Sequence, residues 1–220
     1  VFTAGADVAG MAHTSRAQKS RFALLIVFFA MLRTPSAAPA APDDAPQGIS
    51  IVSGSASQIE DAQWALNRFL VAGIELPSLR IIFHNDYRAC GAREGVLRIV
   101  GERVEIHECE RDRSKSRRSL LHELAHAWDH VAVGISQERR ARFLEARNLS
   151  RWDDDSLPWQ ERGEEQAAEI VAWGLMLNAA PIPTRVGDHG PQDESLLAVA
   201  FEILTGEAPL FSPDPGQVRR

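Results

Sequence analysis

Short apolar runs and a longer helical pattern alternate along the first half of this chain. The apolar runs at residues 49–52 and 79–83 have the length of β-strands. Between them, apolar residues recur at spacings of three and four up to about Ala72, which is typical of a helix with one buried face. Ser55 or Ser57 can cap the start of this helix, because a serine hydroxyl accepts hydrogen bonds from backbone amides of the first turn.

Two further strands are predicted to form a hairpin. Residues 96–100 and 103–108 carry β-branched and other apolar side chains, and Gly101 takes the first central position of the turn between them, as in a type II′ turn. This register pairs Arg98 with Glu105, two opposite charges that stabilise each other across the strands. We expect residues 103–108 to form an edge strand, whose backbone can pair with an extended peptide.

The second half of the chain is predicted to be helical. Residues 119–130 contain no glycine or proline, and their apolar residues again recur at spacings of three and four. Similar patterns predict helices at residues 136–148, 161–177 and 193–204. A small sheet followed by several helices indicates an α+β domain, and residues 49–208 are enough to form one sizeable core.

Residues 122–126 read His-Glu-Leu-Ala-His, an HExxH motif, and they lie within the helix predicted at residues 119–130. His122 and His126 are about one helical turn apart and flank the apolar stripe, so both imidazoles can bind one Zn²⁺ ion. Glu123 then lies beside the open position of the metal, where its carboxylate can accept a proton from a water molecule. The motif therefore predicts a zinc site with Glu123 as the general base.

A catalytic zinc ion usually has three protein ligands, so a third is expected elsewhere in the chain. His130 is eight residues from His122, about 12 Å along the helix axis, and the two cannot bind one ion together with His126. Asp129 and Ala132 occupy the positions at which metzincin peptidases have glycine and histidine, which excludes that class.

The helix predicted at residues 161–177 carries Glu164, Glu165 and Glu169 among small and apolar residues. Glu165 and Glu169 share one helical face with two alanines, which would let this helix approach the HExxH helix closely. Acids on such a face are costly to bury without a partner, and a metal ion with its histidines would be that partner. A solvated first turn would explain Glu164 well but Glu169 poorly.

An HExxH motif followed by a helix with the pattern Glu-x-x-Ala-acid resembles the gluzincin metallopeptidases, particularly the small single-domain ones. The resemblance covers residues 119–172 by motif. It implies a zincin-like fold, in which the hairpin precedes the HExxH helix, and zinc-dependent hydrolysis of peptide bonds. It also implies that Glu165 is the third zinc ligand and that Glu169, one turn further on, orients an imidazole. Related motifs often have Asp or Asn at the position of Glu169.

Gluzincins also tend to have a histidine or tyrosine that stabilises the developing oxyanion, and His189 and Tyr87 are candidates. His107 is expected to be an ordinary surface residue. Two other classes of protein stay open. One is a zinc-binding module that captures peptides without catalysis, against which Glu123 argues, because a structural site has no use for that carboxylate. The other is a metal-dependent hydrolase of another bond, with Cys109 as the third ligand.

Cys90 and Cys109 are the only two cysteines, and an even pair in an exported chain indicates a disulfide. The predicted hairpin supports this pairing. Its register places Cys109 opposite Glu94, within reach of Cys90 if the loop between Cys90 and Gly95 curls back.

Residues 1–40 are expected to be a secretory signal peptide, whose pattern runs from Met11 onward, and either Val1 or Met11 is the start. Basic residues precede an apolar run of 11 residues, from Phe22 to Leu32, and Ala38-Pro39-Ala40 is a cleavage signature. The run is too short to span a bilayer, so no stable membrane span is expected after cleavage; a short uncleaved anchor is the alternative. The remaining segments are then a flexible linker (41–48), the metallopeptidase domain (49–208) and a loose tail (209–220).

Without residues 1–40, which hold four Lys or Arg and one Asp, the chain keeps 20 basic and 29 acidic residues, a net charge of −9. Such an acidic domain argues against nucleic acid as a partner. The one basic stretch, residues 111–118, is expected to be a solvated loop before the HExxH helix. We therefore expect an exported zinc peptidase, secreted or in the cell envelope, that acts on a peptide or protein substrate.

Overall fold

The computed structural model of this protein describes residues 48–110, 112–132, 134–176 and 194–210. The predicted signal peptide, the linker before Gly48, the candidate His189 and residues 211–220 lie outside the described residues. The described helices and strands are β1 (Ile49–Val52), α1 (Ala56–Val71), β2 (Leu79–Phe83), the 3₁₀ helix η1 (Tyr87–Cys90), β3 (Gly95–Val100), β4 (Arg103–Glu108), α2 (Arg113–Val131), α3 (Gln137–Arg147), the 3₁₀ helix η2 (Trp159–Glu161), α4 (Gly163–Leu175) and α5 (Glu194–Thr205).

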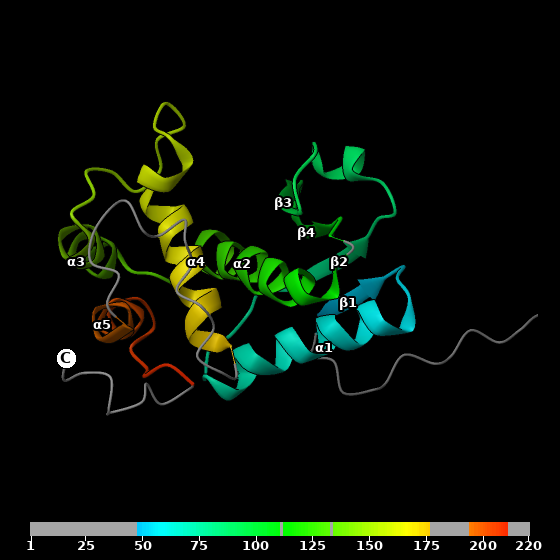
Figure 1. The fold of residues 1–220 in the computed structure, drawn as a ribbon, viewed down its shortest axis with the longest axis horizontal. Helices are drawn as coiled ribbons and strands as arrows, with labels where there is room; N and C mark the ends of the chain where they lie inside the picture. Colours follow the sequence, from blue (N-terminus) through cyan, green and yellow to red (C-terminus); the bar gives the residue numbers. More distant parts are fainter. Residues whose placement is uncertain (1–47, 111, 133, 177–193, 211–220) are drawn as a thin grey trace, which may run out of the picture. The chain divides into compact units, whose positions relative to one another are not determined.

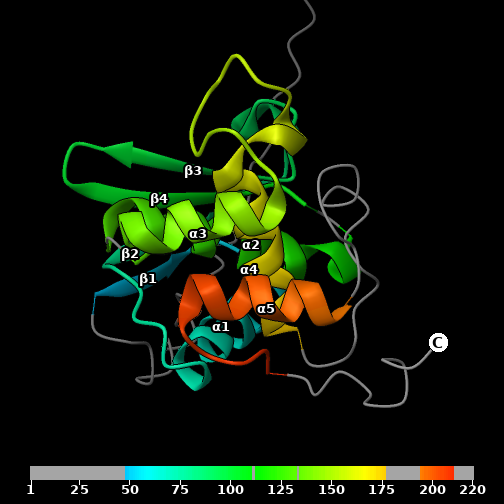
Figure 2. The ribbon, with the colours of Figure 1, turned by 90° about the vertical axis from the view of Figure 1, so that its left-hand side faces the viewer.

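These elements form an α+β fold with a mixed four-stranded sheet and the five helices α1 to α5 (Figure 1). The central helix is α2, which contacts α1, α4 and the strands β3 and β4. In Figure 1, α3 and α5 lie on the side of α4 away from the sheet, and Figure 2, turned by 90°, shows these two helices in front. No helix among the described residues combines the length and the apolar character needed to cross a membrane.

The sheet has the strand order β1-β2-β4-β3. β1 pairs with β2 and β2 with β4 in parallel, whereas β3 and β4 form the predicted antiparallel hairpin. Its register agrees with the prediction, since Arg98 lies opposite Glu105. Just beyond the hairpin, the backbone amide of Cys109 donates to the carbonyl of Glu94 at 2.7 Å. Gly101 begins the turn with a φ of 64°, a conformation that suits glycine.

β4 is an interior strand, so the prediction that residues 103–108 form an edge was wrong. It pairs with β2 on one side and with β3 on the other. Its last three residues, Ile106, His107 and Glu108, are all buried, as expected for a strand covered on both faces. The hydrophobic pattern could not show this, because β2 is distant in the sequence. In the described part of the chain, the edge strands are β1 and β3.

α2 begins at Arg113, six residues before the predicted start, so the interpretation of residues 111–118 as a solvated loop was wrong for its helical part. Two basic side chains of this segment, those of Arg117 and Arg118, have acidic partners on other helices. Nε of Arg117 lies 2.8 Å from a carboxylate oxygen of the buried Asp61 on α1, and Arg118 contacts Glu169 on α4. Ion pairs therefore stabilise the first turns of α2. The spacing of apolar residues could not predict these turns, because their contacts are between charged side chains.

The core lies on both sides of α2. Leu120, Leu121 and Leu124 are completely buried. On α4, Ala168 and Ala172 are 3 % and 0 % exposed, and small residues at a helix interface let two backbones approach closely. The predicted close packing of α4 against the HExxH helix is present in the structure.

Candidate metal site

Three side chains converge where α2 meets α4. The candidate ligand atoms of His122, His126 and Glu165 all lie within 4.8 Å of one another. The two histidine Nε2 atoms are 3.0 Å apart, and each is 3.2 Å from the same oxygen, Oε2 of Glu165. Among the described residues, this is the one group of three or more His, Cys, Asp or Glu side chains close enough to bind one metal ion.

The local helices explain this convergence. His122 and His126 are four residues apart on α2, so their rings project from the same face. Glu165 lies in the first turn of α4, where the nearby positive end of the helix dipole favours a carboxylate. The side chains of His122, His126 and Glu165 are 12 %, 11 % and 15 % exposed, so each keeps a small exposed surface. Two imidazoles and one carboxylate are a donor set that catalytic zinc sites use.

The three groups also tune one another electrostatically. Burial by itself lowers the pKa of His122, but the hydrogen bond to Glu165 and the nearby carboxylate charges outweigh it and raise the pKa to about 9. Burial by itself raises the pKa of Glu165, and hydrogen bonds from both histidines outweigh it and hold the pKa far below its usual range. A histidine must lose its proton to bind a metal, so metal binding at neutral pH would release a proton here.

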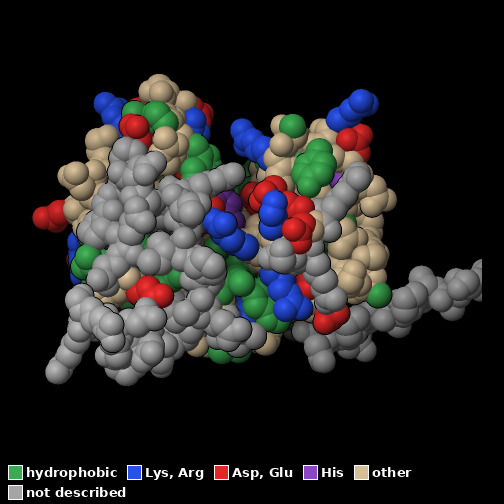
Figure 3. Space-filling model, viewed as in Figure 1, with side chains coloured by type: hydrophobic (Ala, Val, Ile, Leu, Met, Phe, Trp, Pro, Cys, Tyr) green, Lys and Arg blue, Asp and Glu red, His purple; other side chains and the backbone are tan. Residues whose placement is uncertain are grey.

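Glu123, the predicted general base, lies beside this group and faces the sheet. It is 8 % exposed. A β-carbon placed on Gly95, the first residue of the edge strand β3, would lie 2.8 Å from Cγ and 3.1 Å from Oε1 of Glu123. The side chain of Glu123 therefore lies in the space between the α2 backbone and the start of β3. Figure 3 shows histidine side chains in a hollow of the surface, between the part over β3 and η1 and the part over α4.

Glu169, which the resemblance implies to be a residue that orients an imidazole, lies next to His122. Its Oε1 is 3.5 Å from Nδ1 of His122, and its other oxygen contacts Arg118. His130 is not part of the metal group. Its Nε2 lies 3.3 Å from a carboxylate oxygen of Glu164, so these two residues pair with each other.

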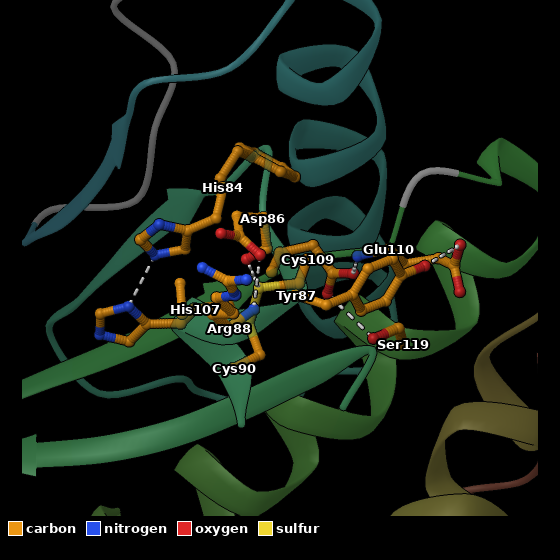
Figure 4. Close-up of a disulfide and its surroundings, with 12 residues drawn as sticks. His84, Asp86, Tyr87, Arg88, Cys90, His107, Cys109, Glu110 and Ser119 are labelled. Carbon is orange, nitrogen blue, oxygen red and sulfur yellow. Dashed lines mark hydrogen bonds between the residues drawn. A yellow bond between two sulfur atoms is a disulfide. The ribbon is translucent and has the colours of Figure 1, made fainter. Parts of the chain in front are cut away.

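Cys90 and Cys109 form the predicted disulfide, which links η1 to the end of β4 (Figure 4). Neither cysteine is therefore a free thiol. Among the described residues, the candidate metal group consists of His122, His126 and Glu165 and does not include Cys109. Tyr87, one candidate for the oxyanion donor, points instead to Glu110, and its hydroxyl donates to Oε1 of that residue at 3.2 Å (Figure 4).

His107 is 8 % exposed, so its interpretation as a surface residue was wrong. Its ring lies parallel to that of His84 within 7°, and the two are joined by a hydrogen bond of 2.8 Å (Figure 4). On its other side, Nε2 is 3.3 Å from a carboxylate oxygen of Glu105. Burial lowers the pKa of His107. His107 was expected at the surface because residues 103–108 were predicted to form an edge strand. As β4 is an interior strand, its residues have neighbours on both sides.

The structure adds residues near the site that sequence reasoning missed. Glu108 is fully buried on β4, accepts a hydrogen bond from the Ser119 hydroxyl at 2.9 Å and faces the same side of the sheet as Gly95. Burial raises the pKa of Glu108 to about 8. Trp159 on η2 stacks on the His122 ring, with centroids 6.0 Å apart. Of these, Glu108 carried a signal in the sequence, as an acid that ends a strand.

Comparisons of this chain with protein-family models, with curated proteins and with solved structures found no match.

Proposed function

We propose that this protein is a zinc-dependent peptidase that uses Glu123 as its general base. The observation that carries the proposal is the convergence of His122, His126 and Glu165 on one point, with a second carboxylate, Glu123, next to them on α2. A purely structural zinc site has four protein ligands and no use for such a carboxylate. The proposal includes a zincin-like fold of the gluzincin type and, from the pattern of residues 1–40, export to the cell envelope or beyond.

The roles of the residues follow from their positions. When bound, a zinc ion would polarise the scissile carbonyl and make a water molecule more acidic. His122, His126 and Glu165 would hold the ion, and Glu169 would fix the ring of His122 through Nδ1. Glu123 would accept the proton of the attacking water and pass it to the leaving amine.

The edge strand β3 is the proposed place for the substrate backbone, instead of β4. Within the described residues, β3 pairs only with β4, so its other edge offers backbone amides and carbonyls to an extended peptide. β3 begins at Gly95, beside Glu123. A peptide added along this edge would therefore pass the general base at one end of the strand.

The disulfide removes the support for one alternative. A hydrolase with Cys109 as third ligand requires a free thiolate, and that sulfur is bonded to Cys90. The other alternative, a zinc-binding module that captures peptides without catalysis, is distinguished by the experiment below.

The proposed function is tested by cleavage of a mixture of internally quenched peptides with the zinc-loaded protein and its Glu123→Gln variant. We expect the variant to keep its zinc and to lose activity by several orders of magnitude, because an amide cannot accept the proton. Glu145→Gln, at an exposed position of α3, is the matched control and should retain full activity. Cleavage that is equal in Glu123→Gln would contradict the mechanism, and zinc binding without any cleavage would favour the capture module.

A further inference from the structure

Two rows of side chains face each other across the contact between α2 and α4. On α2, residues at intervals of four present one guanidinium and three imidazoles on one face. On α4, glutamates meet them in the opposite order along the chain. The pairs are Arg118 with Glu169, His122 with Glu169 and Glu165, His126 with Glu165, and His130 with Glu164. The candidate metal ligands lie in the middle of this series of pairs, and Arg118 lies at one end.

Glu169 is shared between Arg118 and His122. One of its oxygens contacts the guanidinium of Arg118, and the other lies 3.5 Å from Nδ1 of His122. The Glu169 side chain is only 7 % exposed. Nδ1 of His122 is buried, and no partner of good hydrogen-bond geometry faces it among the described residues. The orientation of the Glu169 carboxylate therefore decides whether Nδ1 of His122 has a hydrogen-bond acceptor.

We propose that Arg118 is a positioning residue for the metal centre. It holds Glu169 by one oxygen, so that the other stays 3.5 Å from Nδ1 of His122, in position to accept its proton when Nε2 binds the metal. A proton fixed on Nδ1 leaves Nε2 with its lone pair, and Nε2 is the atom that faces His126 and Glu165. The inference deepens the proposed function, because it rests on zinc binding at His122, but it concerns a residue outside the HExxH motif and outside the ligand group.

The neighbouring basic residues do not offer the same contact. Arg117 faces the other way and pairs with Asp61 on α1. Lys115 is exposed. Without Arg118, one oxygen of the nearly buried Glu169 would lose its charged partner, and the carboxylate would turn towards solvent or towards another donor. The ring of His122 would then lose the contact that fixes its proton.

The test compares Arg118→Gln with the control Lys115→Gln, which removes a positive charge from the same helix at an exposed position. Zinc affinity is measured by competition with a chromogenic chelator. Loss of a residue that orients a ligand directly costs about 10- to 100-fold in metal affinity, and Arg118 acts one contact further out. We therefore expect zinc to bind about 3- to 10-fold more weakly in Arg118→Gln, with Lys115→Gln unchanged and Arg118→Lys in between.

Two further measurements separate positioning from a general loss of stability. In the zinc-loaded protein, the Nδ1–H proton of His122 should be visible by NMR and should exchange faster with solvent in Arg118→Gln. In a Glu169→Gln background, Arg118→Gln should have little additional effect on zinc affinity, because the two residues act through one contact. Equal zinc affinity and equal exchange in Arg118→Gln would overturn the inference alone. Failure of the unaltered protein to bind zinc would overturn the proposed function together with it.

Discussion

A β-carbon on Gly95 would lie 2.8 Å from Cγ of Glu123 and 2.9 Å from the hydroxyl oxygen of Ser119, closer than side chains tolerate. Gly95 is not among the residues with positive φ, so the position requires space and not an unusual backbone conformation. The glycine allows the edge strand β3 to pass close to Glu123, the proposed general base, so the proposed peptide path lies next to that residue.

Gly95→Ala should therefore displace Glu123 while leaving the metal ligands in place. A misplacement of a catalytic group by about 1 Å can cost about 100-fold in rate, so we expect kcat to fall by roughly 10- to 100-fold with zinc content unchanged. Val71→Ala, at an exposed position on α1 away from the proposed peptide path, is the control and should change kcat little. Full activity in Gly95→Ala would show that the base does not depend on this contact.

The three glutamates of α4 should differ in their effect on zinc binding. Glu165→Ala should abolish tight binding, because two imidazoles alone hold zinc poorly in water. Glu169→Ala should weaken binding by about 10- to 100-fold, as loss of an orienting carboxylate does. Glu164→Ala should change it little, since this carboxylate pairs with His130. Titration against a chelator gives all three affinities, and a severe Glu169→Ala with a mild Glu165→Ala would mean that the third ligand is misassigned.

Glu108 should make the protein less stable as the pH rises. Burial, the largest cause, raises the pKa of this fully buried carboxyl to about 8, and the charges of Glu123 and Glu110 act in the same direction. An acid with a raised pKa binds a proton in the folded state that the unfolded chain has released. Its contribution to stability is therefore complete below about pH 4.5 and is lost as the pH rises towards 8.

Glu108→Gln should remove this dependence. Each unit of pKa shift corresponds to about 1.4 kcal/mol, so the variant should gain several kcal/mol relative to the original between pH 5 and about pH 8. The measurement is the free energy of unfolding in urea at three pH values, for both proteins in the same zinc concentration. Parallel pH profiles would show that Glu108 does not carry this proton.

The disulfide should stabilise the hairpin that supplies β3. It joins residues 19 positions apart, and in the chain-entropy model the closure of such a loop contributes roughly 3 kcal/mol. Replacing both Cys90 and Cys109 with Ala should lower the free energy of unfolding by about this amount without removing zinc. If the double variant instead lost its zinc while remaining folded, the third ligand would have to be sought at the cysteines.

Local patterns were enough to predict most of the elements. The Ser55 cap, the hairpin register and the helices α3 to α5 depend on neighbours in the sequence, and the structure agrees with them within a few residues. The interior position of β4 and the burial of His107 could not be predicted in this way. Both follow from the parallel pairing with β2, which no local signal encodes.

Some features of the candidate site could likewise be predicted from the sequence, and others could not. The spacing of His122 and His126 on one helix is visible in the sequence, and so is the acidic face of α4. The contact between Gly95 and Glu123 is not, because it requires the relative position of a strand and a helix. The role of Arg118 is hidden for a similar reason, since a basic residue before an apolar pattern is indistinguishable from a solvated one until its partner on α4 is known.

The proposed mechanism requires one zinc ion bound by His122, His126 and Glu165. X-ray absorption at the zinc edge, on the purified protein with one equivalent of zinc, reports the identity of the ligand atoms. We expect nitrogen and oxygen neighbours at about 2.0 to 2.2 Å, with two imidazoles in the fit, and loss of this signal in His126→Ala. A sulfur neighbour at about 2.3 Å, or no tightly bound zinc at all, would contradict the assignment.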